Sequence, residues 1–214
     1  MKLTHFGHAC VLVETGDSRL LFDPGAYSSG FEALEGIDAV LVTHQHQDHL
    51  SVVNIMALLE ANPAAAVVAD PGSQEVLTEH GVEARAVGAG EVLQLGSATV
   101  ETVGGLHAEV HPEIPRVPNT GYLVDEGAFL HPGDSFVVPT RPVDVLGLPT
   151  GAPWLKVSEA VDFLRAVTPR VAVPIHEALL SRPEVHYRLF EALKPAATTV
   201  ALAPRGEAVD AGDL

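Results

Sequence analysis

The stretch LVTHQHQDHL, residues 41–50, places three histidines and one aspartate within six positions, directly after an apolar run. The segment that leads into it, DAVLVT at 38–43, is almost continuously apolar, which is typical of a strand buried on both faces. Four polar side chains then follow the carboxyl end of this strand, where α/β sheets usually bind ligands. They are His44, His46, Asp48 and His49.

Imidazole nitrogen and carboxylate oxygen are the donor types that Zn²⁺ and similar divalent ions take in proteins. His44 and His46, two positions apart in an extended turn, can point toward one ion. Asp48 and His49 lie on the next turn and cannot easily reach that ion, so we expect them to serve a second ion nearby. The alternative is a solvated helix start with Asp48 as the capping residue, but four ligand-type residues after one apolar strand favour a metal site.

Composition limits the possible partners. The chain has 214 residues, of which 47% are hydrophobic and 19% are charged, as in an ordinary globular protein. Its formal net charge of −16, with no basic patch, argues against nucleic acid and anionic membranes as partners. No stretch approaches the ~18 apolar residues of a membrane helix, and the first residues do not resemble a signal peptide. We therefore expect a cytoplasmic protein.

Strands and helices alternate along the first half of the sequence. Strands are expected at 2–6, 9–15, 18–23, 38–43 and 65–70, and helices at 50–61 and 72–81. In the first helix, one broad apolar face is expected to hold Val53, Ile55, Met56 and Leu59. The single cysteine, Cys10, lies in an apolar run and is expected to be a small buried hydrophobe.

The second half begins with three expected antiparallel strands between residues 82 and 104, followed by a loop rich in Gly and Pro at 104–121. A hairpin is expected at 122–131, strands at 143–149, 170–176 and 199–204, and helices at 158–167 and 184–193. Ser158 is the expected N-cap of the first of these helices. Without a linker or low-complexity tract, residues 1–214 are expected to form one domain.

Four motifs carry a family resemblance. THQHQDH at 43–49 resembles the signature of the metallo-β-lactamase superfamily of metal-dependent hydrolases. RLLFDPG at 19–25, FLHPGDS at 129–135 and AVPIH at 172–176 resemble its further elements, in the same order over essentially the whole chain. The opening HFGHACVLVE at 5–14 looks most like the branch that includes ascorbate-6-phosphate lactonase.

This resemblance implies an α/β fold, a four-layer αβ/βα sandwich with a metal site at one edge between its halves. It also implies two ligand sets joined by a bridging aspartate. The first ion would be bound by His44, His46 and His107, the second by Asp48, His49 and His176, and the bridge would be Asp134.

The roles of the other residues near the site are inferred from their positions in the sequence relative to the strands and the expected ligands. His107 comes closer after the preceding strand than His111, so we expect His107 to be the ligand and His111 to lie at the mouth or behind the ligands. Asp23 is expected to accept a hydrogen bond from a ligand histidine, the alternative being a simple turn residue before Pro24. His8 and His131 adjoin site elements, and Trp154 is expected to pack in the core rather than touch substrate.

The expected function is a binuclear metal-dependent hydrolase in which a metal-bound hydroxide cleaves an ester-like bond of a small molecule, a lactone or a phosphoester. Asp48 is the expected proton acceptor. The alternative is a mono-iron dioxygenase that acts on a sulfur substrate. Zn²⁺ is the first choice for both ions, with Mn or Fe as alternatives, and neither the substrate nor the oligomeric state can be predicted.

Overall fold

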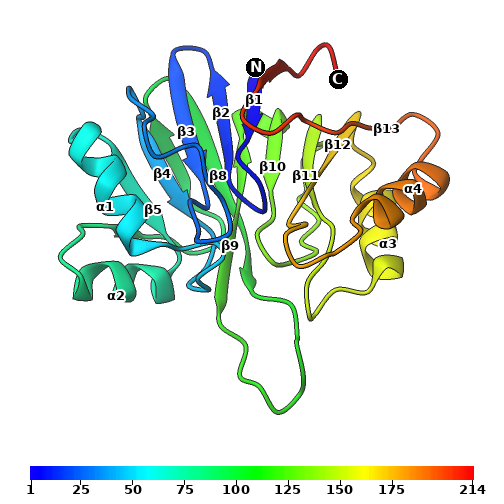
Figure 1. Ribbon diagram of the computed structural model, residues 1–214, viewed down its shortest axis with the longest axis horizontal. Helices are drawn as coiled ribbons and strands as arrows, with labels where there is room; N and C mark the ends of the chain where they lie inside the picture. The colour runs from blue at the N-terminus through cyan, green and yellow to red at the C-terminus, as the bar shows by residue number, and fades with distance from the viewer.

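The computed structural model describes residues 1–214 and contains two seven-stranded mixed sheets packed face to face, with helices covering both outer faces (Figure 1). The first sheet has the order β14-β1-β2-β3-β4-β5-β6. Its strands are β1 (Lys2–His5), β2 (Val11–Thr15), β3 (Ser18–Phe22), β4 (Ala39–Val42), β5 (Ala66–Ala69), β6 (Arg85–Ala86) and β14 (Ala208–Asp210).

The second sheet has the order β13-β12-β11-β10-β9-β8-β7. Its strands are β7 (Val92–Leu95), β8 (Ala98–Leu106), β9 (Pro118–Val124), β10 (Phe129–His131), β11 (Val145–Pro149), β12 (Val171–Ile175) and β13 (Thr199–Val200), and a short 3-10 turn, η1 (Asp125–Gly127), joins β9 to β10. The helices are α1 (Val52–Ala61), α2 (Pro71–Glu79), α3 (Val157–Val167) and α4 (Glu184–Leu193). None of them combines the length and the apolar character that crossing a membrane requires.

Both sheets change from antiparallel to parallel pairing along their width. β1, β2 and β3 pair antiparallel, and β3 to β6 pair parallel. In the second sheet β7 to β10 pair antiparallel, and β10 to β13 pair parallel. The carboxyl ends of neighbouring parallel strands share one edge of their sheet, so loops that follow β3 and β4, or β10, β11 and β12, lie together.

Three apolar clusters define four layers. The cluster between the sheets includes Phe22, Leu41, Tyr122 and Phe129, from both sheets. A second cluster joins the first sheet to α1 and α2, and a third joins the second sheet to α3 and α4. Each sheet is thus apolar on both faces, because one face packs on the other sheet and the opposite face on helices. The expected four-layer αβ/βα sandwich is confirmed, and Cys10 is fully buried, as expected.

The first helix differs from the expectation in its start and in its buried face. α1 begins after Ser51, whose hydroxyl accepts a hydrogen bond from the backbone N–H of Asn54, so Asp48 is not its cap. Its buried residues are Ile55 and Leu58, whereas Val53 is 76% exposed and Met56 46% exposed. The helix is apolar on most sides, so its sequence alone does not specify which side faces the sheet.

The observed bounds of several other strands, of one loop and of one helix also differ from those expected from the sequence. The strand expected at 82–87 is only β6, and it pairs parallel with β5. The loop expected at 104–121 shrinks to 107–117, because β8 and β9 continue their antiparallel ladder as far as Leu106 and Pro118. α3 begins at Val157 after Lys156, so Ser158 is inside the helix and is not its cap. The last expected strand is reduced to β13.

Candidate metal centre

The expected ligands all lie in segments that follow strands. Four of them follow β4: His44, His46, Asp48 and His49. The others follow β8, β10 and β12, and they are His107, Asp134 and His176. The two sheets therefore contribute to one centre, and residues more than a hundred positions apart in the sequence meet there.

The first group of ligand-type side chains contains His44, His46, His107 and Asp134. One donor atom from each lies within 4.8 Å of the others. The rings of His44 and His46 have centroids 4.7 Å apart, and those of His46 and His107 4.8 Å apart. His46 is exposed, whereas the other three are buried, so this group opens to solvent on the His46 side.

The second group contains His8, Asp48, His49 and His176, again with donor atoms within 4.8 Å of one another. Three of these are the residues expected for a second ion. The fourth is His8, which lies between β1 and β2 near the N-terminus. Its ring centroid lies 3.9 Å from that of His176.

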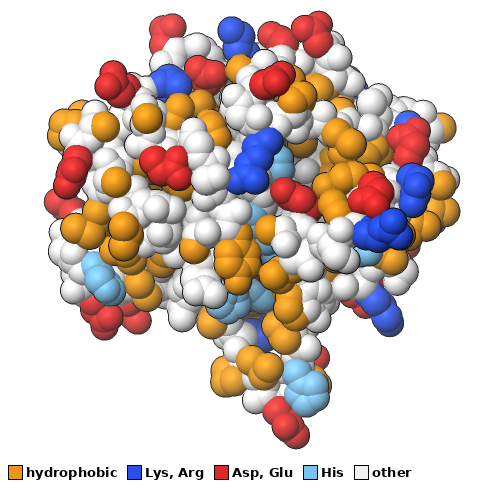
Figure 2. Space-filling view, viewed as in Figure 1, with side chains coloured by type: hydrophobic (Ala, Val, Ile, Leu, Met, Phe, Trp, Pro, Cys, Tyr) orange, Lys and Arg blue, Asp and Glu red, His pale blue; other side chains and the backbone are white.

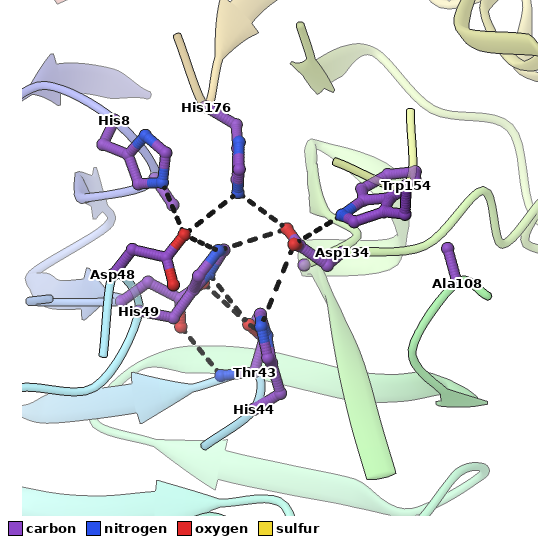
Figure 3. A network of polar contacts seen from close by, with 12 residues as sticks. His8, Thr43, His44, Asp48, His49, Ala108, Asp134, Trp154 and His176 are labelled. Carbon is purple, nitrogen blue, oxygen red and sulfur yellow. Dashed lines mark hydrogen bonds and ion pairs between the residues drawn. The ribbon is translucent and has the colours of Figure 1, made fainter. Parts of the chain in front are cut away.

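Asp134 lies between the two groups, and each of its carboxylate oxygens faces one of them (Figure 3). Oδ1 is 3.1 Å from Nε2 of His49 and 3.1 Å from Nε2 of His176. Oδ2 is 3.3 Å from Nε2 of His107. Trp154 is buried, as expected of a packing residue, but its indole Nε1 also donates a 2.7 Å hydrogen bond to Oδ2 of Asp134.

Buried polar atoms without hydrogen-bond partners indicate whether these residues could bind metal ions. Five inward-facing atoms are buried and have no partner with hydrogen-bond geometry: Nε2 of His44, His49, His107 and His176, and Oδ1 of Asp134. A folded protein rarely leaves so many buried polar atoms unpaired in one place, and each such atom costs about 1–3 kcal/mol. Divalent cations would satisfy all of them, so the donor set fits metal ions.

The opposite ring nitrogens support this assignment. Nδ1 of His49 donates to Asp23, Nδ1 of His107 to the carbonyl of Ala108, and Nδ1 of His176 to the carbonyl of Gly151, at 2.7, 2.6 and 2.8 Å. Because the acceptors are carboxylate or carbonyl oxygens, the hydrogen-bond network assigns the proton to Nδ1. Nε2 of each ring is then the free lone pair that a metal ligand requires.

Asp23 occupies the position behind a ligand histidine that the sequence predicts. It is fully buried, with one carboxylate oxygen 2.7 Å from Nδ1 of His49. The same carboxylate accepts hydrogen bonds from the backbone N–H and the hydroxyl of Thr43, both at 2.7 Å. Asp23 therefore orients His49 and also fixes the first residue after β4.

His8 has a different hydrogen-bond pattern from the other histidines of its group. Its Nδ1 accepts from the backbone N–H of Ala178 at 3.3 Å, which assigns the proton to Nε2. That Nε2–H lies 3.0 Å from Oδ2 of Asp48 and donates to it. The backbone N–H of His8 also donates to Glu177 at 3.0 Å. His8 is thus arranged to hold Asp48 rather than to offer a lone pair.

The other two histidines expected near the site, His111 and His131, lie outside both groups. His131 is buried behind Asp23, stacked on Phe22 at 5.6 Å, and its Nε2 donates to the carbonyl of Ala9 at 2.8 Å. His111 is exposed on the 107–117 loop, where its Nδ1 accepts from the backbone N–H of Glu113. The structure therefore brings His107, and not His111, to the metal groups.

Burial and mutual charge shift the protonation of the centre. Burial, reinforced by the nearby His49, lowers the pKa of His44 well below its ordinary value, so this ring is neutral, as a metal ligand must be. For His176, burial opposes protonation, but the charge of Asp134 outweighs it and raises the pKa to about 9, so an ion bound at Nε2 would have to displace a proton from this ring. Burial also acts against the charge of Asp134, yet His49 and His176 hold its pKa well below the usual range. Asp134 is therefore anionic near neutral pH.

Sequence reasoning missed the contacts of Thr43 and Trp154. Thr43 could have been noticed, because it directly precedes His44 and carries a hydroxyl at the end of an apolar strand. For Trp154 the sequence carries no signal, since twenty positions separate it from Asp134 and no motif includes it.

The sequence of this chain is similar to those of known metal-dependent hydrolases and to a family profile. The sequence profile described as "Beta-lactamase superfamily domain" matches residues 2–176. Protein Rv0786c of Mycobacterium tuberculosis is 52% identical over 185 residues, 85% of this chain and 86% of that protein. A UPF0173 metal-dependent hydrolase of Aeropyrum pernix is 29% identical over 201 residues, 82% of this chain and 81% of that protein.

The fold has close counterparts among solved structures. Igni18, a metallo hydrolase from the archaeon Ignicoccus hospitalis, superposes with a TM-score of 0.77 at 20% identity, and the match covers 97% of each chain. At this identity the likeness concerns the fold alone.

Proposed function

This chain belongs to the metallo-β-lactamase superfamily, and on that premise we propose that it is a binuclear metal-dependent hydrolase. The observation that supports two ions is the position of Asp134, with one carboxylate oxygen toward each histidine group. His44, His46 and His107 would hold one ion, Asp48, His49 and His176 the other, and Asp134 would bridge them. Zn²⁺ is our first choice because the donors are neutral imidazole and carboxylate, with Mn or Fe as alternatives.

We propose an ester-like bond, in a lactone or a phosphoester, as the bond that is cleaved. When bound, two divalent ions would lower the pKa of a water shared between them and polarise the oxygen of the scissile group. The protein's own contribution is to hold both ligand sets rigidly on two sheets and to line the reacting position with acceptors.

Asp48 is the proton acceptor in this proposal. Burial opposes its charge, but contacts with His176 and His8 keep its pKa below the usual range, so it is anionic at neutral pH. The Nε2–H of His8 fixes one carboxylate oxygen at 3.0 Å and leaves the other free to take a proton from the attacking water. Neither a Ser–His nor a Cys–His pair is needed, and Cys10 is buried away from the site.

The mono-iron dioxygenase is not retained as a proposal. A single iron would use one group of ligands and leave the unpaired buried atoms of the other group, such as Nε2 of His49 and His176, without a partner. Each oxygen of Asp134 faces a separate set of three expected ligands, which favours two ions.

The proposal is tested by assaying the purified protein on lactone, carboxylic ester and phosphodiester panels, before and after chelation. We expect turnover that EDTA removes and Zn²⁺ or Mn²⁺ restores. In parallel, metal per chain is measured by mass spectrometry for Asp134→Ala and for a matched control, Asp144→Ala, whose carboxylate pairs with Arg170 at the surface.

Asp134→Ala should lose at least one ion per chain and nearly all activity, and Asp144→Ala should keep both. No metal-dependent turnover on any ester-like substrate, or a wild-type metal ratio in Asp134→Ala, would contradict the proposal.

A further inference from the structure

The two groups of ligand-type side chains open into a cavity of ≈ 170 Å³. Apart from the candidate ligands, the residues that line it are Tyr27, Val110, Pro153, Trp154 and Leu179. All five are apolar or aromatic, and no lysine or arginine is among the lining residues. The reacting position is therefore polar, whereas the space next to it is apolar.

Apolar side chains continue outward from this cavity to the surface. Tyr27 is 38% exposed, Val110 40% and Leu179 49%, and they come from three different loops, after β3, β8 and β12. Beside them, Ile114 is 52% exposed and lines a smaller cavity of ≈ 40 Å³ that shares His46, His107 and Val110 with the first. Figure 2 shows hydrophobic side chains around a hollow in which histidine surfaces are visible, above the protruding 107–117 loop.

Large exposed apolar side chains that gather from separate loops around a polar site usually serve binding. The 107–117 loop extends away from the body of the molecule, so packing does not require its Val110 and Ile114 (Figure 1). Their position next to His107 makes them part of the entrance to the metal groups.

The charges near the cavity do not favour an anionic substituent. Arg116 lines the smaller cavity and not this one, and its Nε–H donates to the carbonyl of His107. Lys156 lines a separate neighbouring cavity beyond Pro153 and Trp154. Asp48 and Asp134 also line the cavity, but bound divalent ions would offset their charge, so the preference rests on the outer wall, which carries no lysine or arginine. A phosphate or carboxylate buried against the wall of this cavity would contact no cationic side chain, and desolvating it there would be costly.

We infer that the substrate is an uncharged carboxylic ester or lactone that carries a short alkyl chain, and this inference rests on the proposed function. The scissile carbonyl faces the metal groups, and the alkyl chain lies against Val110, Trp154 and Leu179. The cavity has the volume of about six liquid waters, which limits the buried part to a short chain. In the reaction, the water oxygen bonds to the carbonyl carbon and the bond from this carbon to the ester oxygen breaks. One proton of the water passes to the alkoxide oxygen and the other to solvent, so the products are a carboxylate and a hydroxyl group, which remain on one molecule when the substrate is a lactone.

The kinetic test uses the metal-loaded enzyme with γ-butyrolactone, γ-hexalactone and γ-octalactone, and a γ-butyrolactone that carries a carboxylate instead of the alkyl chain. We expect kcat/KM to rise about threefold to fourfold for each buried methylene. The carboxylated lactone should be the poorest substrate. Leu179→Ser and Val110→Ser should flatten the dependence on chain length without changing metal per chain. Leu202→Ser is the matched control, since Leu202 is 58% exposed and lines no part of the cavity.

A binding test is independent of turnover. Trp154 is the only tryptophan of the chain and lines the cavity, so its fluorescence reports occupancy. We expect 2-butanone, 2-hexanone and 2-octanone to change this fluorescence at successively lower concentrations, and Leu179→Ser to weaken the trend.

The outcomes separate the two proposals. If lactones are hydrolysed without regard to chain length, or the carboxylated lactone is preferred, the hydrolase stands and the apolar substrate class is wrong. If the ketones bind in order of chain length but no ester or lactone is cleaved, the apolar site stands and the proposed hydrolase is wrong.

Discussion

Trp154 donates its indole N–H to Oδ2 of Asp134 at 2.7 Å, the same oxygen that lies 3.3 Å from Nε2 of His107. The two residues follow β11 and β10, which pair parallel, so neighbouring strand ends place the donor beside the acceptor. This bond fixes the plane of the carboxylate, and the other oxygen, Oδ1, is thereby directed toward His49 and His176. The orientation that allows Asp134 to serve both groups thus depends on an indole.

Trp154→Phe should reduce activity and apparent metal affinity about 10- to 100-fold while the chain stays folded, as is typical when a group that orients a metal ligand is lost. The phenyl ring keeps an aromatic side chain at this position and fills part of the space, but the donor to Asp134 is gone. Metal affinity is measured by competition with a chromogenic chelator. Tyr27→Phe is the control, because it removes a hydroxyl at the same cavity without touching Asp134. Wild-type affinity and activity in Trp154→Phe would show that the indole only packs.

His8→Asn should keep two ions per chain at saturating Zn²⁺ yet lose about 10- to 100-fold in activity. Asn tolerates the backbone φ of +51° at this position, but its side chain is too short to replace the bond to Asp48. The measurement is metal per chain beside kcat. His80→Asn, an exposed histidine at the end of α2, is the control. One ion per chain in His8→Asn would instead make His8 a ligand.

Chelation should lower thermal stability as well as activity. Without ions, four buried Nε2 atoms and Oδ1 of Asp134 remain unpaired, and bound metal stabilises only the native state. At a free metal concentration 100 times the dissociation constant, the gain is about 2.7 kcal/mol. Differential scanning fluorimetry with and without EDTA measures it. Equal melting temperatures for protein verified as metal-free and metal-loaded would contradict a native-state metal site.

The motif after β4 could be read from the sequence because its candidate ligands are local: His44, His46, Asp48 and His49 follow one apolar strand. Gly133, in the FLHPGDS motif, has a local structural cause as well. It has φ +63°, and a Cβ there would lie 2.4 Å from Oδ1 of Asn119, so no other residue fits beside Asp134. The four-layer arrangement followed from the family resemblance, and the helical connections from the alternation of strands and helices.

What could not be read depends on long-range contacts. The donor from Trp154 and the tautomer of His8, set by Ala178 some 170 positions away, arise only when the sheets meet. The same holds for the parallel pairing of β6 and for the outward side of α1, where Val53 and Met56 are exposed. Local periodicity shows that a helix has apolar residues, but the packing partner decides which of them are buried.

Asp70 predicts a pH dependence of stability away from the metal groups. It caps α2 by accepting from the backbone N–H groups of Gly72 and Ser73, yet burial raises its pKa to about 6. Because the folded pKa lies above the unfolded value, its contribution to stability is fully present below about pH 4 and is lost as the pH rises through about 6. Asp70→Asn keeps a capping oxygen and cannot ionise.

The unfolding free energy of Asp70→Asn relative to wild type should therefore increase between about pH 4 and pH 6 and level off above, by up to about 3 kcal/mol. Urea denaturation of both proteins in EDTA, at the same pH values, isolates this effect from metal loss. A constant difference across this range would mean that the pKa of Asp70 is the same in the folded and unfolded states and that Asp70 acts only as a cap.

Asp23→Asn should weaken both the metal site and the fold. The carboxylate of Asp23 receives three donors, from Nδ1 of His49 and from the N–H and hydroxyl of Thr43. An amide supplies one oxygen, so in either orientation its NH₂ group faces a donor, at a cost of about 1–3 kcal/mol. His49 also loses the charged acceptor that fixes its tautomer, so metal affinity should fall about 10- to 100-fold.

Zn²⁺ competition and urea denaturation measure the two effects, and Asp17→Asn, an exposed aspartate, is the control. The metal-free proteins separate them, because the hydrogen-bond cost remains without ions whereas the tautomer effect appears only when His49 binds one. Full metal affinity in Asp23→Asn would mean that His49 does not depend on Asp23 for its orientation, and full stability would mean that the three donors find other partners.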